Sequence, residues 1–343
     1  MSELMLGAVQ PESDADKDLM KAAGIDWVRL GTPFPFVDRL GGELTKGYRR
    51  YREVVAAYAA AGIRVMGVTA QPGSFRWERQ ADGTMAKRWR SRLPEWFGAL
   101  DTPQGVSHYE AMCRWLGEDL KASVRAWQVA NELDISTFAG QLDPRQACDL
   151  LLAGARGLKD ADPSLIVGHN PTGSPAGYYF YGRLYGGGER LLDYCGIDKY
   201  FGSWSPGGPD DWAGLIRELY DLTQTPVLIN EWGFASAGGV MTDDDRRAGR
   251  PTCQTHRWPA TWGDGHTPET QAAYIRAAFD AFIDVKDLLL GELYFRWADT
   301  PTCWQCGQSD CPAETAWGLV DRDGNPKPSY EALKEGARRL REA

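Results

Sequence analysis

Eight short apolar runs alternate with stretches of helical periodicity along the chain, and this alternation constrains the fold more than any other feature. The runs are rich in β-branched and aromatic residues, whereas the stretches between them place apolar residues three and four positions apart. Strands that alternate with helices pair in parallel, and eight such units in 343 residues predict a closed (β/α)8 TIM barrel. The predicted strands are Leu4–Val9, Trp27–Gly31, Arg64–Thr69, Ala126–Ala130, Leu165–Gly168, Gly196–Tyr200, Pro226–Ile229 and Leu290–Trp297. The predicted helices are Tyr48–Ala61, His108–Val124, Pro144–Lys159, Asp210–Leu222, Pro268–Val285 and Ser329–Glu342.

An open doubly wound sheet is the competing architecture for the same alternation. Such a sheet usually carries a Gly-x-Gly-x-x-Gly turn after its first strand, and none follows Val9. No linker, low-complexity tract or short repeat divides the chain. We therefore expect a single barrel domain over residues 1–343, with elongated loops after the third, seventh and eighth strands.

The charge and the histidine spacing exclude several classes of protein. The formal net charge of −9, from 47 acidic and 38 basic residues, disfavours nucleic-acid binding, which needs a clustered basic face. No apolar run approaches the roughly 18 to 20 residues that cross a bilayer, so no membrane span is expected. The start of the chain lacks the features of a secretion signal, which favours the cytoplasm unless a leader has been removed. The four histidines never lie at His-x-His or His-x-x-x-His spacing, which disfavours a metal-dependent hydrolase.

The fourteen tryptophans are the informative surplus in the composition. Each offers a large flat apolar face with one polar group, a surface against which a sugar ring stacks. A carbohydrate ligand is therefore favoured, although core packing is the simpler explanation for any one tryptophan.

Two of the predicted strands end in the same dipeptide. The fourth strand runs into Asn131-Glu132, and the seventh runs into Asn230-Glu231. All strands of a (β/α)8 barrel point the same way, so both glutamates face the mouth where barrel enzymes hold their chemistry. Cleavage of a glycosidic bond needs a proton donor for the departing oxygen and a second carboxylate across the sugar. The pair therefore predicts a glycoside hydrolase that acts on an oligosaccharide, a polysaccharide or another glycoside.

Several segments resemble the clan A glycoside hydrolases. They are Trp127–Glu132, Val227–Phe234, and the end of the chain from Gly318–Asp321 through Gly324–Tyr330. The pattern of strands resembles the clan over the whole chain, and the short segments are similar to families 5 and 39 about equally. The resemblance implies a retaining double displacement on a β-glycosidic bond. It assigns Glu132 as general acid and then base, and Glu231 as the nucleophile.

The resemblance also implies roles for residues at other strand ends. Asn131 matches the residue that binds the sugar 2-hydroxyl, and Arg29 matches the arginine that keeps the nucleophile ionised, with a salt bridge to another acid as the alternative. Tyr200 matches the residue that touches the nucleophile, and Trp297 matches the floor of the cleavage subsite. Core packing explains Tyr200 and Trp297 about as well. His169 ends the fifth predicted strand and therefore faces the mouth as a further candidate for substrate binding, with a purely structural imidazole as the alternative.

The segment after the third strand departs from the clan. Clan members often carry a histidine motif there, whereas this chain has Thr69–Gly73, which puts hydroxyl recognition on that side in doubt. The loop that follows holds six basic residues and only two acidic ones. Such a loop above the mouth could attract a uronate or sulfated sugar, because arginine pairs with carboxylates in a bidentate manner. The alternative is a solvated loop paired with acidic neighbours. The six are Arg76, Arg79, Lys87, Arg88, Arg90 and Arg92.

The seven cysteines fall into two groups. Cys113, Cys148 and Cys195 lie within or at the ends of predicted helices, and we expect buried thiols there. The other four lie in the loops after the seventh and eighth strands, with spacing suited to four-thiolate coordination of a structural zinc ion. Two disulfides are the alternative in an exported protein, and His256 is a possible substitute for one thiol. The four loop cysteines are Cys253, Cys303, Cys306 and Cys311.

Two competing functions stay open beside glycoside hydrolysis. One is a carbohydrate-binding barrel without catalysis, and the less favoured one is a metal-dependent barrel hydrolase. The expected chemistry uses no cofactor, since two carboxylates suffice for it. The sequence leaves open the sugar, its linkage, exo or endo action, and the oligomeric state.

Overall fold

The computed structural model describes residues 4–11, 13–187 and 190–343. Eight parallel strands close into a barrel in which each strand pairs with the next barrel strand along the chain, and the last pairs with the first. The predicted (β/α)8 barrel is therefore confirmed, while the extent of a single domain over 1–343 stays a prediction. The barrel strands are β1 (Met5–Val9), β2 (Trp27–Gly31), β3 (Arg64–Val68), β6 (Val124–Gln128), β7 (Ile166–His169), β8 (Tyr194–Lys199), β9 (Val227–Trp232) and β12 (Leu289–Tyr294).

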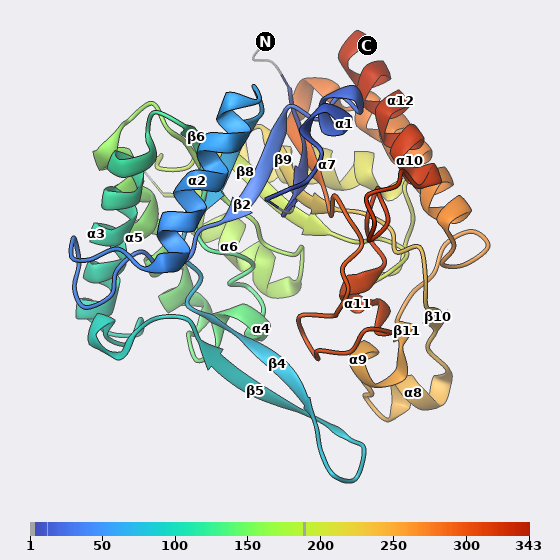
Figure 1. The fold of residues 1–343 in the computed structure, drawn as a ribbon, viewed down its shortest axis with the longest axis horizontal. Helices are drawn as coiled ribbons and strands as arrows, with labels where there is room; N and C mark the ends of the chain where they lie inside the picture. The colour runs from blue at the N-terminus through green and yellow to red at the C-terminus, as the bar shows by residue number, and fades with distance from the viewer. Residues whose placement is uncertain (1–3, 12, 188–189) are drawn as a thin grey trace.

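Helices surround the barrel and connect its strands (Figure 1). Local sequence sets where they begin: at α5, for example, the Asp143 side chain caps the first turn, Gln146 completes the capping box and Pro144 occupies the first turn. No helix within the described residues combines the length and the apolar character needed to cross a membrane. The helices are α1 (Lys17–Ala22), α2 (Lys46–Ala60), α3 (Pro103–Leu120), α4 (Ser136–Ala139), α5 (Pro144–Ala161), α6 (Pro175–Tyr185), α7 (Asp211–Thr223), α8 (Asp243–Arg247), α9 (Thr252–Thr255), α10 (Pro268–Ile283), α11 (Pro312–Thr315) and α12 (Pro328–Glu342), with the 3-10 helices η1 (Glu95–Phe97) and η2 (Lys286–Leu288).

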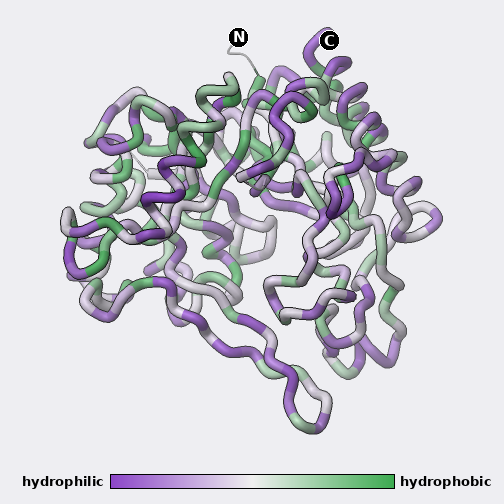
Figure 2. Tube along the Cα trace, in the orientation of Figure 1, coloured by the Kyte–Doolittle hydropathy of each residue, from purple (hydrophilic) through white to green (hydrophobic). Residues whose placement is uncertain are grey.

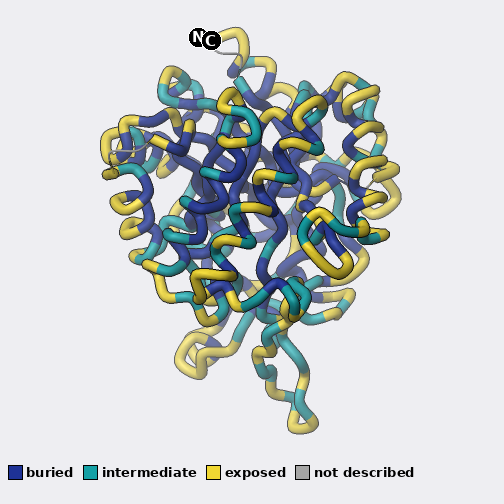
Figure 3. The backbone as a smooth tube through the Cα atoms, turned by 90° about the vertical axis from the view of Figure 1, so that its left-hand side faces the viewer, coloured by how far each residue is buried: buried dark blue, intermediate teal, exposed yellow. Residues whose placement is uncertain are grey.

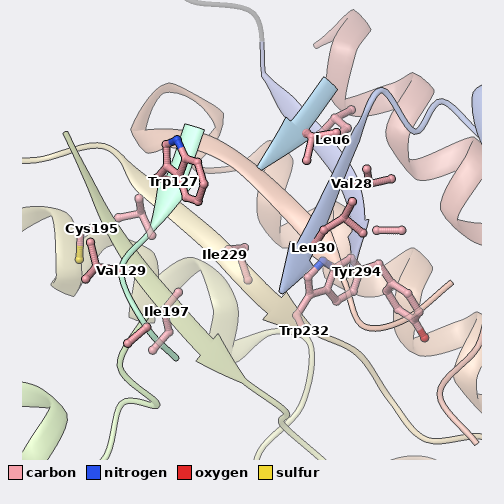
Figure 4. Packing of buried hydrophobic residues seen from close by; sticks show 14 of the residues in the cluster. Leu6, Val28, Leu30, Trp127, Val129, Cys195, Ile197, Ile229, Trp232 and Tyr294 are labelled. Carbon is pink, nitrogen blue, oxygen red and sulfur yellow. The ribbon is translucent and has the colours of Figure 1, made fainter. Parts of the chain in front are cut away.

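The barrel strands are buried on both faces, whereas the helices expose their outer sides (Figure 3). Alternate side chains of a strand point to opposite faces. Outward side chains such as Val28 and Ile229 pack against the helices in a continuous apolar layer (Figure 4). Inward side chains such as Met66, Leu228 and Leu293 meet inside the barrel. Two buried layers thus hold the strands in place.

Inward positions become polar toward the carboxyl ends of the strands. Arg29 on β2, Gln128 on β6 and Asn230 on β9 are all buried there. Buried polar groups need partners, and these three satisfy one another: Gln128 Oε1 accepts hydrogen bonds from Arg29 Nε at 2.7 Å and from Asn230 Nδ2 at 2.9 Å. This polar layer forms the floor beneath the mouth of the barrel.

Long insertions follow the third, seventh and eighth barrel strands, as predicted. After β3 the chain forms the antiparallel hairpin β4 (Gly73–Arg79) and β5 (Met85–Ser91), which projects from the barrel and is mostly hydrophilic (Figures 1 and 2). The insertion after β9 contains α8, α9 and the short strands β10 (Gly239–Val240) and β11 (Arg257–Trp258). The insertion after β12 contains α11. These insertions lie on the side of the barrel opposite the chain termini (Figure 1).

Several sequence-based boundaries need correction. The eighth barrel strand ends at Tyr294 and not at Trp297, so the last three residues of the predicted strand lie outside it. Cys195 lies in β8 and not at a helix end. It is nevertheless a buried free thiol, as are Cys113 and Cys148, as predicted. The sequence-based assignment did not include the hairpin β4–β5 or helix α6.

Candidate active site

A cavity of about 1270 Å³ opens at the carboxyl ends of the barrel strands. Its lining includes Glu132 and Glu231, which the sequence places at the fourth and seventh strand ends, together with Asp198 from the sixth. Residues from the insertions after β3 and β12 extend its walls. A cavity of this size, with convergent carboxylates at its base, is typical of a small-molecule or sugar site.

The two predicted glutamates face each other across the cavity floor. One carboxylate oxygen each of Glu132, Asp198 and Glu231 lies within 4.8 Å of the other two. Retaining glycosidases hold their two carboxyl groups about 5 to 5.5 Å apart, whereas inverting enzymes separate them by about 6.5 to 9.5 Å to admit a water molecule. The closest carboxylate oxygens of Glu132 and Glu231 therefore lie nearer to each other than the separation that an inverting enzyme needs.

Glu231 is held in place by two hydrogen-bond donors. Arg29 Nη1 forms an ion pair with Glu231 Oε1 at 2.5 Å, and the Tyr200 hydroxyl donates to Oε2. Both partners are buried, and Arg29 pairs with Glu231 as expected from the sequence. Burial, followed by the nearby Glu231 carboxylate, raises the pKa of Tyr200 well above its usual value. The hydroxyl therefore stays protonated and acts as a donor, an arrangement that stabilises the charged form of Glu231.

Asn131 is anchored through its side-chain oxygen. Asn131 Oδ1 accepts hydrogen bonds from Arg29 Nη2, from Gln128 Nε2 at 3.2 Å and from Asn170 Nδ2 at 2.9 Å. The amide NH2 group has no hydrogen-bond partner among the described residues and remains a donor at the cavity wall. This orientation is the one needed to donate to a sugar hydroxyl.

The backbone turns sharply between β6 and Glu132. Ala130 and Glu132 have φ angles of 51° and 46°, in the left-handed region that non-glycine residues seldom adopt. Such strained positions cluster at functional sites, where the surrounding contacts must hold them. The Thr69 hydroxyl accepts a hydrogen bond from Ala130 N at 2.8 Å, and the Gln71 amide bonds both N and O of Asn131. Thus Thr69–Gly73, which departs from the clan at the sequence level, supports the turn that carries Glu132.

Asp198 is a site residue that the sequence analysis missed. Its carboxyl group is buried, lies within 4.8 Å of the Glu132 carboxyl group and accepts a hydrogen bond from Asn170 Nδ2 at 2.5 Å. Carboxyl groups packed this closely resist being ionised at the same time. Burial, followed by Coulomb repulsion from the neighbouring carboxylates, raises the pKa of both Glu132 and Asp198 well above their usual values. The signal in the sequence was a lone aspartate inside the apolar run Gly196–Tyr200.

His169 and Trp297, which the sequence predicted to bind substrate, do not line the cavity. His169 is fully buried, with Nδ1 bonded to the Val129 carbonyl at 2.8 Å and the ring stacked on Phe180, and burial lowers its pKa to about 3. Trp297 is 3% exposed and packs against Tyr330. Alternation of neighbouring residues explains the first error, because His169 and Asn170 face opposite sides, whereas Trp297 lies beyond the end of β12, where strand alternation no longer applies. Asn170 contacts the site where His169 was expected, and Phe295 lines the cavity where Trp297 was expected.

The basic residues after β3 make mostly local contacts. Arg88 and Arg90 both pair with Glu78 across the hairpin, and Arg79 donates to Gln308 at 2.9 Å. Of the six basic residues, only Arg92 lines the large cavity. The hairpin is therefore largely the paired, solvated loop that was the alternative interpretation, with one arginine left at the substrate side.

The four loop cysteines come together in space. Their sulfur atoms lie within 4.8 Å of one another, and each is a free thiol. His256 is not part of this group, because its ring faces Asp310 at 3.4 Å instead. The cluster is the one group of cysteine side chains among the described residues that is suited to hold a metal ion.

Comparison with solved structures shows which known proteins share this barrel fold. No family model matches the chain. The GH5_18 protein of Streptomyces cattleya, solved in complex with GlcNAc, superposes with a TM-score of 0.69 at 19% identity, covering 99% of this chain and 80% of that one. This chain has the fold of the clan A glycoside hydrolases. The exo-β-1,4-mannosidase Op5Man5 from Opitutaceae bacterium strain TAV5 superposes with a TM-score of 0.64 at 19% identity, covering 98% of this chain and 59% of that one.

One sequence relative is also a glycosidase by name. A β-xylosidase of Caldicellulosiruptor saccharolyticus is 25% identical over 251 residues, which make up 69% of this chain and 47% of that protein. The chain therefore spans about half the length of this relative. A β-D-glucuronidase of Dictyoglomus thermophilum is also similar in structure, with a TM-score of 0.59 at 18% identity over 98% of this chain and 50% of that one.

Proposed function

We propose that this protein is a retaining glycoside hydrolase that cleaves a β-glycosidic bond. The observation that carries the proposal is the approach of the Glu132 and Glu231 carboxylates to within 4.8 Å at the floor of an open cavity. The β configuration rests on the resemblance to clan A, and the names of the similar proteins, a β-xylosidase and an exo-β-1,4-mannosidase, support it.

The first step of the proposed reaction forms a glycosyl-enzyme. Glu231 attacks the anomeric carbon, the bond to the leaving oxygen breaks, and Glu132 transfers its proton to that oxygen. In the second step Glu132, now a carboxylate, takes a proton from water. The resulting hydroxide attacks the anomeric carbon, and the bond to Glu231 breaks. The raised pKa of Glu132 fits a group that must start each cycle protonated.

Neighbouring side chains support these two roles. Arg29 and Tyr200 stabilise the charge on Glu231 before attack and after release. The NH2 group of Asn131 is available to a hydroxyl beside the anomeric carbon, where hydrogen bonds strengthen as positive charge develops. All of these groups belong to the chain itself.

Assay against a panel of aryl β-glycosides, each paired with its 2-deoxy-2-fluoro analogue, tests the proposal. We expect turnover of at least one aryl glycoside, and mass spectrometry of the fluorosugar-treated protein should find the label on the peptide that contains Glu231. Release of the α-anomer of the sugar as the first product, or a label on a residue other than Glu231, would contradict the retaining mechanism. Sugar binding without turnover of any member would instead favour a carbohydrate-binding barrel.

Tyr200→Phe should lower kcat by about 10- to 100-fold, the effect of removing one hydrogen bond to a charged group. The loss arises because Glu231 keeps Arg29 but loses the Tyr200 donor. Steady-state kinetics on an aryl β-glycoside measures the effect. Tyr181→Phe is the matched control, since that buried hydroxyl donates to the Gly196 carbonyl outside the cavity. Equal kinetics for the two variants would contradict the role of Tyr200.

Asp198→Asn should move the alkaline limb of the kcat/KM–pH profile to lower pH by about one unit. In the parent protein the last proton of the Glu132–Asp198 pair leaves against the charge of a neighbouring carboxylate, which raises the upper pKa of the pair. The amide removes that charge, so Glu132 loses its proton at a lower pH. Asp134→Asn also removes a charge that repels Glu132, but Asp134 lies outside the group of three close carboxylates, so its shift should be smaller. An unchanged or alkaline-shifted limb in Asp198→Asn would contradict the coupled titration of the two carboxyl groups.

A further inference from the structure

Four cysteines from two insertions form a compact group, here named the thiol cluster. One comes from α9 after β9, and three come from the insertion after β12. Three of the four are buried and Cys306 is half-buried. The surrounding side chains are apolar or aromatic and include Trp77 and Met85 of the hairpin. The members are Cys253, Cys303, Cys306 and Cys311.

The backbone around the thiol cluster turns so that its sulfurs face one point. Between Cys303 and Cys306 the chain reverses, with Gly307 at φ 76° and its N–H donating to the Cys303 carbonyl at 2.7 Å. Gln308 closes the arrangement, because its carbonyl accepts from Cys303 N at 2.9 Å and its side-chain amide donates to the Cys253 carbonyl at 3.0 Å. These bonds tie the two insertions together at the thiols.

The geometry suits a tetrahedral metal ion. Zinc binds thiolates at about 2.3 Å, which places the sulfurs about 3.8 Å apart, within the 4.8 Å limit that the thiol cluster meets. Tetrahedral four-sulfur sites hold zinc or iron, and zinc is the usual structural ion in short segments that lack an apolar core of their own. Four protein ligands leave no open position for water, so the ion would do no chemistry.

Residues that line the substrate cavity lie close to the thiol cluster in the sequence. Trp304 and Gln305 lie between two of its members, and Glu314 lies three residues after another; all three line the cavity. Gln305 Nε2 donates to Glu314 Oε1 at 2.7 Å, and the Gln305 carbonyl accepts from Trp77 N at 2.8 Å. A displacement of the cysteines would therefore move one wall of the cavity.

We propose that the thiol cluster binds one zinc ion, which holds Gln305 and Glu314 in the wall of the substrate cavity. The metal site stands apart from the chemistry of the cavity, whereas its effect on substrate rests on the proposed glycosidase function. The ion acts as a cross-link between the insertions after β9 and β12, because it takes one ligand from the first and three from the second.

Metal analysis and thiol counting test the zinc site without any substrate. Purified full-length protein should contain one zinc per chain by plasma mass spectrometry, and all seven thiols should react after denaturation and chelation. Cys306→Ser, at the half-buried position, should lose the metal, and Cys148→Ser, a buried thiol of α5, should keep it. Cobalt(II) in place of zinc should give the visible absorption of a tetrahedral thiolate site. Three reactive thiols in a metal-free protein would establish two disulfides and overturn the proposal, as would iron in place of zinc or full zinc in Cys306→Ser.

Hydrogen–deuterium exchange tests whether the ion fixes the cavity wall. Peptides that contain Trp77 and residues 303–317 should exchange at least about tenfold faster in Cys306→Ser, and in wild-type protein stripped by a chelator, than in the zinc-loaded protein. Barrel-strand peptides should not change, which separates local loosening from unfolding. For an active aryl β-glycoside, KM should rise about tenfold while kcat changes little. Equal exchange with and without zinc would overturn the role of the ion in the wall, whatever the activity results.

Discussion

Glu231→Ala should lower kcat/KM for an aryl β-glycoside by about 10⁵-fold. The variant removes the group that forms the covalent intermediate and leaves Arg29 and Tyr200 facing an empty space. Azide should restore part of the activity by occupying that space on the α face of the sugar. The product should then be the α-glycosyl azide, identified by nuclear magnetic resonance, because azide attacks from the side that Glu231 has vacated.

Glu292→Gln is the matched control for that experiment. Glu292 lies in β12, next to β9, and is buried outside the cavity, where its carboxylate accepts a hydrogen bond from Trp232 Nε1 at 2.5 Å. Burial raises the pKa of Glu292 to about 8, so this side chain is already neutral at pH 7 and an amide imitates it closely. We expect near-parental activity from Glu292→Gln. If Glu231→Ala retained more than about 1% of parental activity without azide, Glu231 would not be the nucleophile.

The barrel and its two glutamates could be predicted because both follow from local pattern. The run that ends in Ile229 and the run that ends in Ala130 are apolar, and each stops at an Asn-Glu pair. Parallel strands in one closed sheet have all carboxyl ends on one side, so the two pairs had to meet. The thiol cluster follows from similar reasoning, since cysteine spacing within loops is visible in the chain, although its metal stays a proposal.

One error arises where a single residue of register decides which face a side chain takes, and the other where a strand was predicted to run too far. His169 and Asn170 are neighbours, and only Asn170 reaches the site. Trp297 was assigned to the cavity by extending the eighth strand three residues too far, whereas Phe295 lines the cavity. Strand boundaries that are inferred from apolar runs are uncertain by more than one residue. A shift of one residue within a strand moves a side chain from the core to the cavity, or the reverse.

Asp198 and Gln128 were missed for a different reason. Each is a polar residue inside a strand, and its role in the site depends on partners from distant parts of the chain. Asp198 contacts Asn170 and lies beside Glu132, and Gln128 contacts Arg29. The local sequence does not show which distant residues these partners are. A charged residue within an apolar strand is costly to bury unless it is paired, so such a residue is itself a signal that partners exist nearby.

Glu132→Ala should lower kcat/KM by about 10²- to 10⁴-fold for substrates with a poor leaving group, because the departing oxygen no longer receives a proton. A dinitrophenyl β-glycoside, whose leaving group needs little protonation, should still form the glycosyl-enzyme rapidly. The intermediate then accumulates, because no base activates water for its hydrolysis. A rapid burst of dinitrophenol followed by slow turnover should therefore be visible by stopped-flow absorbance.

Azide distinguishes this variant from Glu231→Ala. In Glu132→Ala it attacks the glycosyl-enzyme from the face where Glu132 stood, so the product should be the β-glycosyl azide, the opposite anomer to that of the nucleophile variant. The opposite stereochemistry of the two rescues follows only if the carboxylates lie on opposite faces of one sugar ring, the arrangement proposed for Glu132, which follows β6, and Glu231, which lies in β9. The same anomer from both variants would exclude the assigned roles, even if both lost activity, because loss of activity alone also results from a damaged fold.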